Sequence, residues 1–304
     1  MAITLTQLRS FLAVLRTGSV TAAADELVVT QPSVSAAVSA LSRELGVELT
    51  QRVGRSIEPS AAGEAFAPFA ADVIGLLDQG GRAAREAADG ASSELRLGAV
   101  TTAGEHIVPP LIEAFSSLHP EITLNLDVGN RTRVFERVRL HRSDVAIGGR
   151  PPGEGVVGER FLENPIVVIT KPGDPLADRR AVPIKELAAR PWLLREEGSG
   201  TRTMTEEILA QNDMNPPVLT LGSNGAIKQG VRAGLGVSLQ SRLATRLELE
   251  LGLLTTIDVS PPLTPRHWYL LRAAHGPVRP PVKAFLAFAR SSEGRKVIET
   301  AQES

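Results

Sequence analysis

Apolar side chains between residues 4 and 45 recur every three or four positions in three short segments, which predicts three α-helices. Thr17-Gly18-Ser19 separates the first helix from the second, because glycine ends a helix and serine caps the next one. Thr30-Gln31-Pro32-Ser33 opens the third helix, since a proline in a first turn loses no hydrogen bond. Two helices joined by a four-residue turn and braced by a third indicate a helix-turn-helix.

One face of the third predicted helix, opposite its apolar stripe, carries short and mostly hydroxylic side chains, Ser42 among them. Short polar groups reach base edges and phosphates in a DNA major groove without steric conflict. A small helical bundle with a solvated, serine-rich face is the alternative, because helix-turn-helix geometry has no unique residue code. The residues that we predict to contact DNA on this helix are Thr30, Gln31, Ser33, Ser35, Ala36, Ser39 and Arg43.

Residues 47–59 predict a hairpin beside this helical unit. Two short strand patterns flank Val53-Gly54-Arg55, so Arg52 and Arg55 lie near the tip, where they can touch DNA phosphates. Through residue 59 the unit carries five arginines and five carboxylates, and its net charge is therefore zero. Because counterion release from one such copy gives only modest affinity, we expect two or more copies to bind DNA together.

The pattern from 60 to 88 predicts one long helix that starts at Ser60. Its apolar residues follow one another at alternating intervals of four and three positions, the heptad repeat of a coiled coil. A helix packed on its own domain is the alternative, but a 3.5-residue period favours a long partner helix. The residues predicted to form a contact between two copies are Phe66, Phe69, Val73 and Leu76. Residues 89–93 predict a short flexible hinge.

From residue 94 onward, strand patterns alternate with helix patterns, which predicts parallel sheets with helices on their faces. We expect two α/β lobes: lobe I from residues 94–164 and 265–304, and lobe II from residues 165–264. Lobe I should include a helix over 104–118 and a last helix over 282–290. Lobes of this kind bind small molecules in the cleft between them, outside the carboxyl ends of the strands.

Two loops that precede helices predict an anion site in this cleft. The segment 100–104 offers two hydroxyl groups, and the segment 197–202 offers small residues followed by an arginine. Free N–H groups and the helix dipole favour a bound anion there, to which the arginine can add a bidentate contact. Ordinary helix capping is the alternative for each loop taken alone. The residues predicted to bind an effector are Thr101, Thr102, Arg150, Ser199, Gly200, Thr201, Arg202 and Asn224.

Composition narrows the functional class. The chain has 304 residues, 33 basic and 34 acidic side chains, 42% hydrophobic residues and no cysteine. Disulfides, thiolate metal sites and cysteine nucleophiles are therefore excluded, and no apolar run approaches the roughly 18 residues of a membrane span. The first residues lack the pattern of a secretory signal, so we expect a cytoplasmic protein without a membrane partner.

No catalytic or metal-binding constellation is present in the sequence. The five histidines lack paired metal-ligand spacing, and neither a Gly-x-Ser-x-Gly elbow nor a Walker loop occurs. We therefore expect no catalytic residue, no metal and no cofactor apart from the effector. A solute-binding protein and an enzyme are the alternatives. The first is disfavoured by the segment 1–93 and the missing signal, and the second by the missing nucleophile–base set.

These residues resemble the LysR-type transcriptional regulators along essentially the whole chain. The residues that carry the resemblance in the family's order and spacing are Phe11, Gly18-Ser19, Ala22-Ala23-Ala24, Leu27, Gln31-Pro32-Ser33-Val34-Ser35, Leu41, Leu45-Gly46, Arg52 and Ala62-Gly63. The resemblance implies a multidomain α+β fold. A winged helix-turn-helix at 1–59 and a dimerising linker helix and hinge at 60–93 would precede a two-lobed effector-binding domain at 94–304, similar to periplasmic binding proteins.

The same resemblance implies regulation of transcription from pseudo-palindromic sites on double-stranded DNA by tetramers, with a small effector and RNA polymerase as further partners. It implies that Gln31, Ser33 and Ser35 face DNA, and that Arg52 contacts a phosphate. The loop 197–202 is similar to that of members controlling sulfur assimilation or carbon fixation, which favours an anionic metabolite as the effector.

Overall fold

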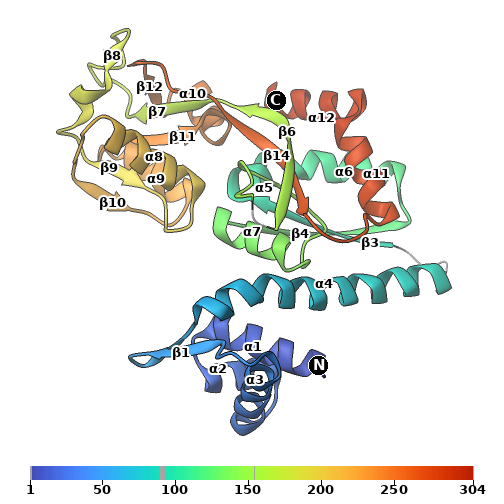
Figure 1. Cartoon of the computed structure of the whole chain (residues 1–304). Helices are drawn as coiled ribbons and strands as arrows, with labels where there is room; N and C mark the ends of the chain where they lie inside the picture. Colours follow the sequence, from blue (N-terminus) through green and yellow to red (C-terminus); the bar gives the residue numbers. More distant parts are fainter. Residues whose placement is uncertain (1, 90–92, 154, 304) are drawn as a thin grey trace. The chain divides into compact units, whose positions relative to one another are not determined.

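A computed structural model describes residues 2–89, 93–153 and 155–303 of the chain (Figure 1). The chain divides into two compact units. The first holds residues 1–91 with the short segments 139–142 and 273–277, and the second holds the remainder. Most of the predicted hinge lies outside the described residues. Within the part of the chain that the structure describes, no helix is both long and apolar enough to cross a membrane.

The first unit begins with three helices and a hairpin. The elements are α1 (Leu5–Thr17), α2 (Val20–Leu27), α3 (Gln31–Leu45) and the antiparallel strands β1 (Thr50–Val53) and β2 (Ser56–Pro59). Their apolar faces enclose a core in which Phe11, Val34 and Leu41 are fully buried. The spacing of these side chains along each helix is the reason that the three helices pack together.

Local chemistry sets the ends of these helices. The hydroxyl groups of Ser19 and Thr30 accept hydrogen bonds from first-turn N–H groups of α2 and α3. Gly18 and Gly46 end α1 and α3 in the left-handed region, at φ 65° and 71°. Val28 ends α2 at φ 56°, an uncommon conformation for a β-branched residue, and its side chain is 90% exposed.

The hairpin is joined to one long helix, α4 (Ala61–Asp89). The Ser60 hydroxyl accepts a hydrogen bond from the Gly63 N–H at 3.1 Å and donates one to the Glu48 carbonyl at 2.6 Å. Gly63 lies so close to the hairpin that a Cβ atom there would stand 1.9 Å from the Leu49 carbonyl oxygen. The start of α4 is therefore fixed against the hairpin by backbone contact.

Lobe I of the second unit is built on a five-stranded sheet. In spatial order its strands are β4 (Ile122–Gly129), β3 (Ser93–Val100), β5 (Val145–Gly148), β14 (Arg266–Ala273) and β6 (Val156–Asn164). The helices of this lobe are α5 (Thr101–His106), α6 (Val108–Leu118), α7 (Arg131–Arg139), α11 (Pro280–Arg290) and α12 (Ser292–Glu303). Strand β3 is parallel to β4 and β5, and β14 returns antiparallel to β5. Phe115 and Phe285 meet in its core with ring centroids 5.2 Å apart.

Lobe II contains three small sheets and three α-helices among the described residues. The strands are β7 (Ile166–Thr170) between β11 (Ser238–Ser241) and β12 (Thr255–Ile257), β9 (Trp192–Leu194) beside β10 (Val218–Thr220), and β8 (Val182–Pro183) beside β13 (Val259–Ser260). The helices are α8 (Gly200–Gln211), α9 (Asn224–Arg232) and α10 (Arg246–Glu250), with 3₁₀ turns at Ile184–Leu187 and Arg242–Thr245. Hydrogen bonds from Arg190 and Thr170 hold the pKa of the buried Asp174 well below its usual value, although burial opposes the shift.

The helices of lobe I differ from the prediction at two places. The segment predicted as one helix over 104–118 consists of α5 and α6, and α5 already begins at Thr101. Pro109 and Pro110 cause the break, because neither has the N–H group that a continued helix would require. The chain also ends in α12, which the prediction missed; its Ile298 is fully buried in the lobe I core.

Gly63 gives a stability prediction for the first unit. Gly63→Ala should lower the free energy of unfolding by about 1–3 kcal/mol, because its Cβ displaces the Leu49 backbone. Gly80→Ala on the same helix is the control: it meets no atom within 4 Å and should stabilise by about 0.5–1 kcal/mol. Urea unfolding with hydrogen exchange of α1 to α3 measures both. Equal effects of the two variants would contradict the close backbone contact.

Candidate functional site

The first candidate site is the outer surface of α3. The structure leaves all the residues predicted to contact DNA on this helix exposed: Thr30, Gln31, Ser33, Ser35, Ala36, Ser39 and Arg43. The Thr30 hydroxyl is engaged in capping, with the Ser33 N–H at 3.4 Å and the Ser33 hydroxyl at 2.8 Å. Ser42 lies elsewhere. It is buried, and its hydroxyl accepts a hydrogen bond from the Leu49 N–H.

The arginines of the first unit are sorted by position. Arg43 on α3 and Arg52 and Arg55 on the hairpin are exposed, and no carboxylate of a described residue lies within ion-pair distance of them. Arg9 and Arg16, on α1, instead pair with Asp78 and Glu26 respectively. Residues 1–59 therefore present unpaired positive charge beside α3, although their net charge is zero.

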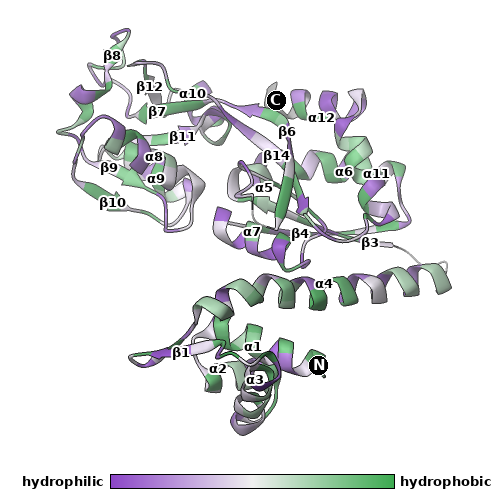
Figure 2. Ribbon diagram, in the orientation of Figure 1, coloured by the Kyte–Doolittle hydropathy of each residue, from purple (hydrophilic) through white to green (hydrophobic). Residues whose placement is uncertain are grey.

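Helix α4 exposes an apolar stripe, and the green colour along this helix in Figure 2 marks its hydrophobic residues. Phe69, Val73 and Leu77, at successive turns, are 68%, 48% and 50% exposed. Two residues of the predicted contact, Phe66 and Leu76, are half-buried, and the Phe66 ring lies 5.9 Å from that of Phe11. Leu77 was not anticipated, because the apolar residues of α4 fit more than one helical face.

The second candidate site lies where the two lobes of the second unit meet. Arg195, at the end of β9, is buried and donates hydrogen bonds to Asn224, to Thr101 at 3.3 Å and to Glu196. Asn224, the first residue of α9, donates to the Thr102 hydroxyl at 3.2 Å and to Glu105 at 3.3 Å. Asn224 therefore links the lobes rather than facing an open space.

A small hollow of about 40 Å³ lies beside these bonds. It is lined by Thr101, Thr102, Ser199, Gly200 and Thr201, so five of the predicted effector residues are brought together from both lobes. Its volume has room for little more than a water molecule. An effector of metabolite size therefore requires space beyond this hollow.

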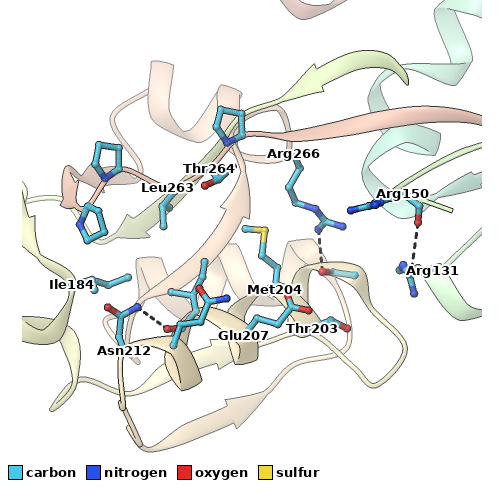
Figure 3. Close-up of a pocket in the computed structure, with 16 residues that line it drawn as sticks. Arg131, Arg150, Ile184, Thr203, Met204, Glu207, Asn212, Leu263, Thr264 and Arg266 are labelled. Carbon is cyan, nitrogen blue, oxygen red and sulfur yellow. Dashed lines mark hydrogen bonds between the residues drawn. The ribbon is translucent and has the colours of Figure 1, made fainter. Parts of the chain in front are cut away.

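A larger hollow of about 840 Å³ adjoins it, and Figure 3 shows the residues that line it. Arg131, Gly200 and Arg266 line both hollows and so form the wall that they share. Arg150, another predicted effector residue, lines the larger hollow only. Arg202 lines neither; it pairs with Glu206 at 2.7 Å and donates to the Arg195 carbonyl.

The shared wall is electrostatically unbalanced. The Arg131 guanidinium stands over the Phe135 ring, 4.5 Å from its centroid, and Arg266 donates to the Gly200 carbonyl at 3.0 Å. Burial lowers the pKa of Arg131, against the attraction of Glu207. Burial and the positive charge of Arg131 lower the pKa of Arg266. An anion bound between these two guanidinium groups would be stabilised by both of them.

Comparison with known proteins decides the family. The LysR substrate binding domain matches residues 88–293, and the bacterial regulatory helix-turn-helix protein, lysR family, matches residues 5–64. The chain is 37% identical over 270 residues to the transcriptional activator CmpR of Synechocystis sp., covering 88% of each chain. It is 36% identical over 298 residues to a RuBisCO operon transcriptional regulator of Allochromatium vinosum, covering 97% of this chain and 98% of that one.

The chain belongs to the LysR family of transcriptional regulators. Among solved structures, the CcmR regulatory domain of Synechocystis PCC6803 in complex with 2-PG matches with a TM-score of 0.62 and 30% identity, covering 68% of this chain and 97% of that one. A Corynebacterium glutamicum OxyR C206 mutant covers 100% of this chain and 95% of that one, with a TM-score of 0.62 and 24% identity, and shows the fold alone. The predicted fold class is confirmed.

Membership of the LysR family makes this chain a DNA-binding transcriptional regulator with an effector-binding domain, and not an enzyme. Its described residues contain no group of three or more histidine, cysteine, aspartate or glutamate side chains that could hold a metal ion.

Arg131, Arg195 and Arg266 were not predicted as site residues of this LysR-family chain. Arg131 begins α7 two residues after β4 ends, and Arg195 follows β9 directly. A charged residue at the carboxyl end of a strand was the signal that could have identified these two. Arg266 begins the strand that returns to lobe I, and no local pattern distinguishes it.

Asn224 gives a test of the bonds between the lobes of this LysR-family effector domain. Asn224→Ala should lower the free energy of unfolding by about 1–3 kcal/mol, because it leaves the buried Arg195 side chain short of a partner. Gln229→Ala, an exposed position on the same helix, should change it little. Thermal and urea unfolding measure both variants. An Asn224→Ala protein as stable as Gln229→Ala would show that these bonds do not hold the lobes together.

Proposed function

We propose that this LysR-family regulator binds pseudo-palindromic promoter DNA as a homodimer or a dimer of dimers, and that a small organic anion bound between its lobes alters that binding. The regulator acts with RNA polymerase in the cytoplasm. One observation carries the effector part: Arg131 and Arg266 meet at the wall of two hollows, and no carboxylate of a described residue lies within ion-pair distance of either. Guanidinium groups placed in this way favour a carboxylate or phosphate ligand.

The surface of α3 supports the DNA part of the proposal. Its exposed side chains are short, as a helix that enters a major groove requires. Arg43, Arg52 and Arg55 lie on the same helix and the adjoining hairpin, without carboxylate partners among the described residues. They can therefore contact phosphates on either side of the groove and position α3, while α3 reads base edges.

The exposed stripe of α4 supports pairing of two copies. Phe69, Val73 and Leu77 expose apolar surface along one face of a long helix, and contiguous surface of this kind marks an interaction site. A second copy of α4 presents the same stripe and covers it symmetrically. Pairing also brings two sets of unpaired arginines to one DNA site. The affinity of the pair for DNA is therefore higher than the modest affinity expected from one copy of low net charge.

Two relatives support an anionic effector. The CcmR regulatory domain was solved in complex with 2-PG, and one similar regulator is named for the RuBisCO operon. An anion such as 2-phosphoglycolate carries a phosphate and a carboxylate, both of which suit guanidinium groups. We therefore take 2-phosphoglycolate as the first effector probe for this chain. Gel shifts of its own upstream DNA with and without this probe test the whole proposal, and no retardation at low salt would overturn it.

Arg52 tests the placement of the hairpin on DNA. Arg52→Gln should weaken binding to every sequence alike and should reduce the slope of log affinity against log salt by roughly 1 for each subunit bound. Arg9→Gln is the matched control, because Arg9 pairs with Asp78 on α4. Fluorescence anisotropy at several salt concentrations measures both slopes. The same slope for both variants would mean that Arg52 touches no phosphate.

Arg131 and Arg266 test the effector site. Arg131→Gln and Arg266→Gln should each weaken the response to 2-phosphoglycolate by about tenfold or more, because each loses a charge-assisted hydrogen bond. Binding to DNA without the probe should stay as in the unchanged protein. Arg202→Gln is the control, because the sequence predicts that Arg202 binds the effector, whereas the structure pairs it with Glu206 outside both hollows. The response should therefore be unchanged in this variant. Loss of response in Arg202→Gln alone would move the site to the start of α8.

A further inference from the structure

The larger hollow has two chemically different ends, and Figure 3 shows them on opposite sides of the view. Arg131, Arg150 and Arg266 lie at one end, where the hollow meets the lobe junction. Ile184 and Leu263 lie at the other end, with Met204 of α8 between the two ends. One hollow thus joins a cationic end to an apolar end.

The cationic end is incompletely neutralised. Three guanidinium groups face the hollow together with one carboxylate, that of Glu207. Glu207 lies beyond ion-pair distance of all three, and no other carboxylate of a described residue comes within it. Burial lowers the pKa of Arg266, and the nearby positive charge of Arg131 lowers it further. A ligand with an anionic group would remove this excess of positive charge.

Apolar residues from both sides of the hollow gather toward the end that holds Ile184, where Asn212 also lies. The apolar side chains that line the hollow are Ile184, Met204, Ile208, Pro261, Pro262, Leu263 and Pro265. Ile184 is buried, whereas Met204, Ile208 and Leu263 pack partly on the lobe II core and partly face the hollow. Each apolar group that covers this apolar wall removes hydrocarbon surface from water on both sides of the contact.

We propose that the larger hollow binds an amphipathic organic anion, with its carboxylate or phosphate between Arg131, Arg150 and Arg266 and its aliphatic or aromatic body along α8. This ligand class deepens the proposed function and rests on it for any effect on DNA. A wholly polar anion of two or three carbons would use the cationic end and leave most of the 840 Å³ unfilled. The size and the apolar wall both favour the larger ligand.

The shared wall couples this ligand to the small hollow. Arg131 and Arg266 line both hollows. When their guanidinium groups hold an anion in one hollow, they are no longer available to an anion in the other. Inorganic phosphate should therefore compete with an amphipathic anion for the protein, although phosphate has no apolar part.

Isothermal titration of the full chain with three probes tests the ligand class. Octanoate has the anionic group and the apolar body, acetate has only the first, and 1-octanol has only the second. We expect octanoate to bind tighter than either of the others by about tenfold or more, since it uses both ends of the hollow. Equal affinities of octanoate and acetate would overturn the proposal, and so would equal affinities of octanoate and 1-octanol.

Variants of α8 locate the binding. Gln211→Trp places a large ring in the hollow from an exposed position, and Ala210→Trp places the same ring on an exposed position outside the lining. Octanoate binding should fall about tenfold or more in Gln211→Trp and stay unchanged in Ala210→Trp. Leu263→Ser, which removes apolar wall without adding bulk, should lower it as well. Circular dichroism confirms the fold of each variant, and undiminished binding in Gln211→Trp and Leu263→Ser would place octanoate elsewhere.

The outcome of the octanoate titration does not depend on the outcome of the gel shifts that test the proposed function. Binding is measured without DNA, so the absence of a 2-phosphoglycolate response in gel shifts leaves the octanoate result standing. Conversely, a normal 2-phosphoglycolate response with no octanoate binding overturns the amphipathic ligand alone. Arg150→Gln, at the cationic end, should weaken octanoate by about tenfold and leave 1-octanol unchanged.

Discussion

The bonding of Arg195 constrains the whole second unit. A buried guanidinium group is costly unless its N–H groups are satisfied, and here its partners come from both lobes: Asn224 and Glu196 from lobe II and Thr101 from lobe I. Satisfying this one side chain brings the start of α9 against the start of α5. The small hollow has little volume because the loops that line it are held together by these bonds.

Much of the fold follows from periodicity. The helices α1 to α3 begin and end close to their predicted positions, because Gly18, Thr30 and Gly46 specify their ends by conformation and capping. The break between α5 and α6 was also encoded, by Pro109 and Pro110, but the apolar pattern runs through both helices and hides it. Helix α12 is polar apart from a few positions, and its packing on lobe I through Ile298 stabilises it.

The candidate effector site was predictable only in part. That a helix begins shortly after β3 and another after β9 could be inferred from the small residues there, although α5 begins at Thr101 and not at the predicted residue 104. The fate of each polar side chain could not. Arg202 has an acidic residue one turn later and pairs with it, whereas Arg131 and Arg266 lie 135 positions apart and meet only through the tertiary fold. The sequence shows which charges have a partner close by along the chain. Only the tertiary structure shows which charges are left without a partner and are therefore available to a ligand.

Each of the two units contains both paired and unpaired arginines. In the first unit Arg9 and Arg16 are paired, and Arg43, Arg52 and Arg55 lack carboxylate partners among the described residues. In the second, Arg202 is paired, and Arg131, Arg150 and Arg266 lack such partners. A guanidinium group left without a carboxylate keeps its capacity for an external anion. A chain with almost no net charge can therefore recognise both DNA and a small anion. Which arginines are already paired with carboxylates, and not the total charge, sets where anions bind.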